Sequence, residues 1–326
     1  MGEIKQKEAV IKSVFLVPAL FFLLIPVIVR SGRISSIFIS ALMFGAMGAS
    51  FDLSAGYMGI TNFGYAAFVG LGAYTSALLM IRMGITPWIG MIIGGMVAAV
   101  VGFLVGLLTL RLRGIFMACF AWFFAEAARL TFANLVDITR GYLGLHVPPF
   151  PPIKTPFGTI SFIARSRIPA YLLILSLTFI ILLILNHIIN TRLGLAWRAI
   201  KGNEDAAKAS GINTTLYKTL NFTISCFFAG VLGSFYAHYV HVLTPDVMGL
   251  AFTIQVLTVC YVGGRGTLWG SIVGSFIVTV ILEFLRPLMV MRFIIYGVLL
   301  IAVMVIYPDG MAKALKKLYS FIIEKI

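Results

Sequence analysis

TRLGLAWRAIKGNEDAAKASG, residues 191–211, is a polar, helix-forming stretch that lies between two long apolar segments. Asn203 is a favoured helix N-cap, and Glu204 and Asp205 place carboxylates in the first turn that follows it. Gly211 can close that helix in left-handed geometry. The stretch therefore predicts a short, capped helix that is held between two membrane spans.

A short amphipathic segment precedes this helix. Leu195, Trp197 and Ile200 supply its apolar side, Arg198 adds a charge, and Gly202 ends it. A soluble protein could receive such a helix pair in a groove. The same pattern would also suit a helical linker that lies on the membrane surface. The residues alone leave both interpretations open.

The composition places the whole chain in a membrane. Of its 326 residues, 60% are hydrophobic and 11% are charged, and the mean hydropathy is +1.04. Soluble domains carry about twice that share of charged residues. We therefore expect an all-α, polytopic bundle in which residues 1–326 form a single transmembrane domain. This domain includes the polar loop at about 191–216.

About ten segments are apolar enough to cross a bilayer, each needing about 20 residues. They are 14–29, 34–51, 61–81, 88–110, 115–135, 168–190, 217–240, 249–264, 267–285 and 292–307. Glycine interrupts 61–81, and 249–264 is short. Either of these two could turn back within the membrane, so the number of spans could fall to eight or nine.

The basic residues indicate an orientation. With ten spans, 15 of the 25 Lys and Arg residues share a side with both termini and the 191–216 loop, and nine lie opposite. Arg129 falls inside a span. Because cytoplasmic loops carry more Lys and Arg, both termini and this loop are expected in the cytoplasm. The net charge of +14 has the same explanation, and we expect no nucleic-acid partner.

Small residues recur at every fourth position in several segments, as in Gly90, Gly94 and Ala98, or in Ala229, Gly233 and Ala237. Such stripes allow helix backbones to approach closely in lipid. They predict tight packing between helices, although some of the glycines could instead line a path for a solute.

The two glycine-interrupted regions, 56–74 and 249–270, supply candidate residues for a substrate path. Broken helices in membranes are tolerated where they face protein or a watery cavity. The polar side chains there are Asn62, Tyr65, Tyr74, Thr253, Gln255 and Arg265. The alternative is that they only form hydrogen bonds between helices. Asp52, at the end of a span, is expected to cap the irregular segment that follows it.

A few charged or titratable residues fall within the expected spans or at their ends. Glu126 and Arg129 are three residues apart, so they can form a local ion pair on one helix. A proton relay would also need Glu283, which lies in a late span. His238 and His241 have no third ligand at a supporting spacing, so no metal site is expected.

Several catalytic motifs are missing from the chain. There is no GxxxxGK[ST] phosphate loop, no HExxH and no GxSxG. We therefore expect that the chain is not an enzyme and that it binds no cofactor itself.

The run Gly194–Asn213 resembles the coupling loop of ABC importer permeases, and more narrowly that of LivM-type permeases of branched-chain amino acid transporters. Four further blocks are similar to this family, in family order: Asp52–Tyr74, Arg111–Phe116, Tyr261–Gly270 and Tyr307–Gly310. By this resemblance, the residues that contact an ATPase are Gly194, Trp197, Arg198, Glu204, Asp205, Ala206, Ala207 and Gly211.

The resemblance implies a set of partners. They are a second, LivH-like permease, two cytoplasmic ATPase subunits that hold ATP and Mg²⁺, and an extracytoplasmic solute-binding protein. It also implies the cytoplasmic (inner) membrane of a prokaryote as the location. Branched-chain amino acids are the expected substrate, with urea, short amides or another small solute as alternatives. A gradient-driven secondary transporter that uses Glu126, Arg129 and Glu283 is the competing hypothesis.

Overall fold

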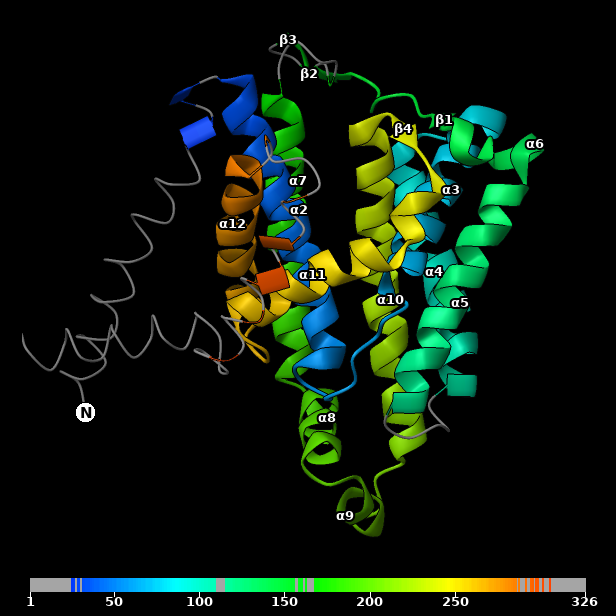
Figure 1. Ribbon diagram of the computed structural model, residues 1–326, viewed down its shortest axis with the longest axis vertical. Coiled ribbons are helices and arrows are strands. Elements are labelled where there is room, and N and C mark those ends of the chain that lie inside the picture. Colours follow the sequence, from blue (N-terminus) through cyan, green and yellow to red (C-terminus); the bar gives the residue numbers. More distant parts are fainter. Residues whose placement is uncertain are drawn as a thin grey trace, which may run out of the picture.

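The computed structural model describes residues 31–109, 115–155, 158–160, 162 and 167–285, with isolated positions at 25–26, 28–29 and between 287 and 305. Long helices that run side by side make up most of it (Figure 1). In chain order the elements are α2 (Gly32–Ala55), α3 (Tyr65–Met83), α4 (Pro87–Thr109), α5 (Ile115–Asn134), α6 (Val136–Thr139), η1 (Gly141–Leu143), β1 (Leu145–His146), β2 (Ile153–Thr155), β3 (Gly158–Ile160), α7 (Ile168–Ile189), α8 (Arg192–Gly202), α9 (Glu204–Ala209), α10 (Thr214–Val240), β4 (Val242–Leu243), η2 (Pro245–Met248), α11 (Leu250–Gly263) and α12 (Leu268–Phe284).

Six of the described helices, α2, α3, α4, α5, α7 and α10, are long and apolar enough to cross a bilayer. They correspond to six of the expected spans, and the all-α membrane bundle is confirmed. The described part of the chain gives six spans, or seven if one bent helix pair counts as a span, and not the expected ten. The expected spans 14–29 and 292–307 lie outside the continuously described residues.

The bent pair covers the expected segments 249–264 and 267–285, the first of which was expected either to span or to turn back within the membrane. α11 and α12 meet at a bend of 113°. With 14 residues, α11 is too short to cross a bilayer alone. Gly264 and Gly266 between them have φ of 111° and 76°, a region that favours glycine, so the helix cannot continue through them. The other uncertain segment, 61–81, forms the continuous helix α3.

Glycines let α3, α4 and α10 pack backbone against backbone. A Cβ on Gly233 would lie 1.9 Å from the carbonyl oxygen of Val69, and one on Gly72 would lie 2.1 Å from that of Gly230. A Cβ on Gly94 would lie 2.5 Å from Ser234 Oγ. The small-residue stripes therefore hold helices together, as the sequence predicts.

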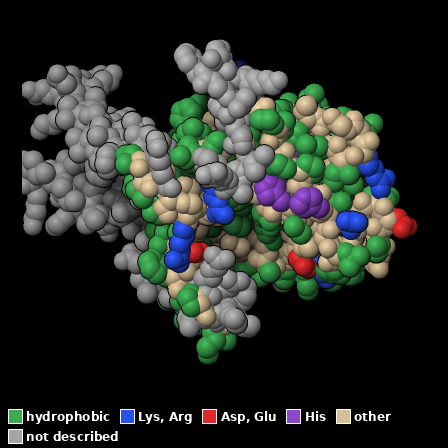
Figure 2. Space-filling model, turned by 90° about the horizontal axis from the view of Figure 1, so that it is seen from above, with side chains coloured by type: hydrophobic (Ala, Val, Ile, Leu, Met, Phe, Trp, Pro, Cys, Tyr) green, Lys and Arg blue, Asp and Glu red, His purple; other side chains and the backbone are tan. Residues whose placement is uncertain are grey.

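Burial is uneven across the bundle. In the most apolar part of α2, 78% of residues are buried, against 11% in α5, so α2 is central and α5 peripheral. The exposed side chains of the outer helices are themselves apolar, for example Met96 and Val100 on α4, Phe123 on α5 and Phe179 on α7. Hydrophobic side chains also cover much of the rim in Figure 2. Such a surface suits contact with lipid.

The two ends of the bundle differ (Figure 1). At one end, which we call the strand end, β1 pairs antiparallel with β4, with Leu145 opposite Leu243, and β2 forms a hairpin with β3. The proline-rich stretch 148–152 has no regular secondary structure there, as its composition predicts. At the opposite end, α8 and α9 project from the bundle between α7 and α10.

Replacing Gly233 with alanine should weaken the contact between α3 and α10, because the new Cβ would overlap the Val69 carbonyl. Overpacking of this kind costs about 1–3 kcal/mol. We expect a lower unfolding temperature for the purified chain in detergent. Gly32→Ala on α2 is the matched control, since nothing lies within 4 Å of its Cβ. Equal unfolding temperatures for the two variants would show that this close approach does not stabilise the bundle.

Candidate functional site

The polar stretch folds into α8 and α9, and capping side chains define where each helix begins. The hydroxyl of Thr191 accepts a hydrogen bond from the backbone N–H of Leu193 at 3.3 Å. Asn203 Oδ1 accepts from the N–H groups of Asp205 and Ala206, both at 3.0 Å. The N-cap predicted at Asn203 is therefore present, and it separates the two helices with one extended residue.

Gly211 ends α9 in the left-handed conformation, with φ of 84°. Its N–H donates to the carbonyl of Lys208, and the N–H of Ile212 donates to the carbonyl of Ala207, both at 3.0 Å. This is the hydrogen-bond pattern of a Schellman motif, which uses a left-handed residue to satisfy the last carbonyls of a helix. The predicted role of Gly211 as a helix end is therefore present.

Trp197 holds α8 against the bundle. Its side chain is fully buried, and Nε1 donates to the carbonyl oxygen of Tyr217 on α10 at 2.9 Å. Gly194 is buried too, and a Cβ there would lie 2.0 Å from the carbonyl oxygen of Ile189 at the end of α7. Both residues were expected to contact an ATPase, but their side of α8 faces α7 and α10.

Glu204 ties α9 to α10. Its carboxylate accepts from Lys218 Nζ at 2.6 Å and from Lys208 Nζ at 3.0 Å. Partial burial raises the pKa of this carboxyl, but the two lysines lower it by a larger amount, so the pKa falls from 4.5 to about 2. The carboxylate of Glu204 therefore stays charged at neutral pH. Ala207, in the same helix, is buried.

The other predicted contact residues lie at the surface. Arg198, Asp205, Ala206 and Gly211 are all exposed, and the guanidinium of Arg198 also donates to the carbonyl oxygen of Ile189 at 3.3 Å. The α8–α9 pair therefore has an anchored side and an exposed side, and only the exposed side can meet a soluble protein without rearrangement.

A pocket of about 520 Å³ opens where the α8–α9 pair meets the bundle. It lies between the linker that joins α2 to α3, the start of α5, and the α8–α9 pair. Its wall mixes apolar and charged side chains, including Ile60, Phe63, Met117, Lys201, Glu204 and Lys218.

Three of the candidate path residues meet where α3 begins. Asn62 is buried, and its Oδ1 accepts from the N–H of Gly64 at 2.9 Å. Tyr65 is fully buried and donates to the carbonyl of Met47 at 3.2 Å. Thr253 on α11 accepts from the N–H of Ala66 at 3.1 Å. Asn62 and Thr253 thus accept backbone N–H groups at the start of α3. Tyr65 joins α3 to α2, and Thr253 joins it to α11.

The remaining candidates are spread over the bundle. Tyr74 is fully buried in α3, with its ring 4.8 Å from that of Phe132. Gln255 is half-buried in α11. Arg265 is exposed at the α11–α12 turn, with its guanidinium 4.7 Å from the centre of the Tyr261 ring. The structure therefore does not bring all six together around one cavity.

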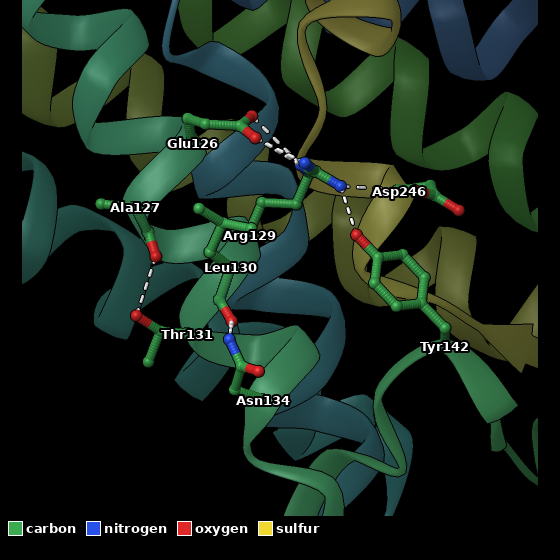
Figure 3. Close-up of polar contacts among 8 residues, drawn as sticks. All are labelled: Glu126, Ala127, Arg129, Leu130, Thr131, Asn134, Tyr142 and Asp246. Atoms are coloured by element: carbon green, nitrogen blue, oxygen red, sulfur yellow. Dashed lines mark hydrogen bonds and ion pairs between the residues drawn. The ribbon is translucent and has the colours of Figure 1, made fainter.

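The expected pair of Glu126 and Arg129 forms, and it is part of a larger cluster (Figure 3). Arg129 Nε lies 3.2 and 3.1 Å from the two oxygens of Glu126. The other side of the guanidinium contacts the hydroxyl of Tyr142 from η1 and lies 3.8 Å from Asp246 in η2. Little of α5 is buried against other helices. The contacts of Arg129 with η1 and η2 therefore help to hold it on the bundle.

Glu283 lies apart from this cluster in the described part of the chain. Glu283 lies on α12 and pairs with Arg33 at 3.3 Å. In Figure 1, α12 and α5 stand on opposite sides of the bundle. The cluster around Arg129 and the pair at Glu283 are therefore separate structural contacts.

His238, near the strand end, also has a local role; Figure 2 shows histidine side chains near the middle of that face. His238 Nδ1 lies 2.8 Å from the carbonyl oxygen of Pro148, so this nitrogen carries the proton. Its Nε2 then accepts from Ser76 Oγ at 2.9 Å. Among the described residues, no group of three His, Cys, Asp or Glu could hold a metal ion.

Sequence reasoning missed the partner of Asp52. This residue was expected to cap the segment that follows it, but its Oδ1 accepts from the N–H of Gly266 at 2.8 Å. It thus caps the other glycine-rich region, at the α11–α12 turn. A lone carboxylate in an apolar stretch was the available signal, but nothing local identified the donor. The sequence also predicted no contact for Lys201, which donates to the carbonyl oxygen of Gly56, or for Lys218, which pairs with Glu204.

Comparison with known proteins places these features in a family. Residues 33–307 match the model of the family described as branched-chain amino acid transport system / permease component. LivM of Salmonella typhimurium, a high-affinity branched-chain amino acid transport system permease protein, is 29% identical over 83% of this chain and 68% of its own length. Probable branched-chain amino acid transport permease proteins of Methanocaldococcus jannaschii also match: LivM is 23% identical over 80% of this chain and 88% of its own, and LivH is 26% identical over 80% and 87%. No solved structure gave a significant match.

The contact of Glu204 with α10 should depend on pH only under acidic conditions. A carboxyl whose pKa is lowered on folding stabilises the fold above its unfolded value of 4.5 and loses that contribution as pH falls toward about 2. We expect amide exchange of residues 205–210, corrected for its intrinsic rate, to stay constant from pH 8 to pH 5. It should then accelerate as pH falls below about 4.5. In Glu204→Gln this step should vanish; if the variant kept it, another group would be responsible.

Proposed function

Since the chain belongs to the branched-chain amino acid transport permease family and is a multi-pass membrane subunit of an ATP-binding cassette importer, we propose that α8–α9 is its coupling element. The exposed side of this pair, with Arg198, Asp205, Ala206 and Gly211, would contact an ATPase subunit. The observation that carries this proposal is the division of α8–α9 into an anchored and an exposed side. A coupling element must be rigidly attached to the spans and also open to a partner.

Two ATPase subunits would hold ATP and Mg²⁺ as separate chains, since this chain has no phosphate-binding loop. A second, LivH-like permease and an extracytoplasmic solute-binding protein would complete the importer. The LivM and LivH relatives support the permease pair. If α8–α9 contacts the ATPases, it lies in the cytoplasm of a prokaryote, and the bias of basic residues places both termini on the same side. The strand end would then meet the binding protein.

We propose branched-chain amino acids as the substrate, because the matched family and the similar proteins are described as transporting them. Urea, short amides or another small solute are the alternatives within the same family. Transport would proceed by alternating access. Closure of the ATPases would pull on α8–α9, and Trp197 and Glu204 would pass that movement to α10 through their contacts there. The movement can act only if the two states bind the loop differently.

Replacing Gly211 with arginine should uncouple ATP hydrolysis from uptake while the chain still inserts into the membrane. A non-glycine residue at φ of 84° is strained, so α9 would end differently and its exposed side would shift. The measurement is a pull-down on the tagged chain in mild detergent, with mass identification of what co-purifies, together with leucine uptake. We expect a Walker-containing ATPase with the wild type and its loss from Gly211→Arg.

Gly84→Arg is the matched control. Gly84 also has positive φ, 67°, with nothing within 4 Å of its Cβ, but it ends α3 on the far side of the bundle. This variant should keep the ATPase. Normal uptake by Gly211→Arg would contradict a coupling role for α9. A wild-type chain that transports without any ATPase would instead favour a gradient-driven carrier.

A further inference from the structure

Asp52 joins two parts of the chain that lie far apart in sequence. It is fully buried in the last turn of α2, and its Oδ1 accepts from the N–H of Gly266 at 2.8 Å and from Cys260 Sγ at 3.3 Å. Both donors belong to the bent α11–α12 pair, one in α11 and one in the turn. The end of α2 is therefore fastened to the place where the pair bends.

The fit at this contact leaves no room for adjustment. A Cβ on Gly56 would lie 2.0 Å from Asp52 Oδ1 and 2.3 Å from the backbone nitrogen of Gly266. Gly266 and Gly264 themselves need positive φ. Because the backbone at the end of α2 touches the backbone of the α11–α12 turn, we expect a displacement of one to displace the other.

The same end of α2 also touches α8. Lys201 Nζ donates to the carbonyl oxygen of Gly56, and the N–H of Gly56 donates to the carbonyl of Asp52 at 2.7 Å. Lys201 also packs on the linker, where its Cγ would lie 3.2 Å from a Cβ on Gly59. A continuous series of contacts thus runs from α8 through Gly56 and Asp52 to Gly266.

We propose that Asp52 is a positioning residue that transmits movement of α8–α9 to the α11–α12 turn. This inference rests on the proposed function, in which α8–α9 is the element that an ATPase moves. The bent pair is the part of the described bundle that can most readily respond. It is two short helices joined by a glycine turn, whereas the other spans are continuous.

Asp52 would act through its acceptor oxygen and not through its charge. The two groups that donate to Oδ1 are neutral, and Oδ2 has no partner within the described residues. The nearby ammonium of Lys201 donates to Gly56 instead. Both contacts to Oδ1 need only an acceptor oxygen, which a carboxamide also supplies. Asparagine, which keeps an oxygen at the Oδ1 position, should therefore replace it.

The test uses the complete transporter, purified through a tag on this chain and reconstituted in liposomes. Leucine uptake per ATP hydrolysed should fall at least about fivefold in Asp52→Leu, which matches the side chain in size but accepts no hydrogen bond. Asp52→Asn should stay close to wild type, and so should the control Gly32→Ala on the same helix. A purely structural role would lower the yield or stability of Asp52→Leu without changing uptake per ATP. That outcome, or failure of Asp52→Asn, would overturn the proposal.

A second measurement does not depend on the substrate. Thiol labelling of Arg265→Cys, followed on the peptide that contains residue 265, should change on adding ATP. The change should disappear in Asp52→Leu and in Lys201→Met. Lys201 lies outside the spans, so that variant tests the linkage even if Asp52→Leu does not fold. An ATP response that survives Lys201→Met would overturn the linkage, while an active ATPase with no leucine uptake in the wild type would overturn only the proposed substrate.

Discussion

Lipid offers no hydrogen-bond partner to a polypeptide backbone, so each interruption of a helix within this bundle must be satisfied by another part of the chain. Three side chains do this in the described structure. Thr253 of α11 accepts the N–H of Ala66 where α3 begins, and Asn62 accepts that of Gly64 just before it. Asp52 of α2 accepts the N–H of Gly266 between α11 and α12. The polar residues that break up the apolar pattern are thus what permits the breaks, and they fix which helices lie next to each other.

Close backbone contact is the second consequence of the membrane. Because apolar side chains gain little by leaving lipid for protein, helices associate where small residues allow near approach. Gly72, Gly230 and Gly233 supply this between α3 and α10. α5 has few such contacts and is fastened instead by Arg129, whose guanidinium reaches Tyr142 and Asp246. The bundle therefore has a tightly packed centre and one outer helix that is held by polar groups near the strand end.

At the other end, α8–α9 gains its rigidity from contacts that face inward. Trp197 and Glu204 both bind α10, and Lys201 binds the end of α2. A force applied to the exposed side of α8–α9 would thus be shared between two central helices. The two short helices that project from the bundle are thereby joined to two of its central helices.

The sequence by itself determined what depends on near neighbours. The apolar runs predicted the helices, Asn203 and Gly211 predicted the ends of α9, and the spacing of Glu126 and Arg129 predicted their pairing. Each of these depends on residues within one or two helical turns. The tertiary structure alone decided that Asp52 meets Gly266, 214 residues away, that Trp197 packs on α10, and that α11 and α12 meet at a bend of 113°. These features depend on where whole helices pack in space, and no local pattern records which donor a buried oxygen will find.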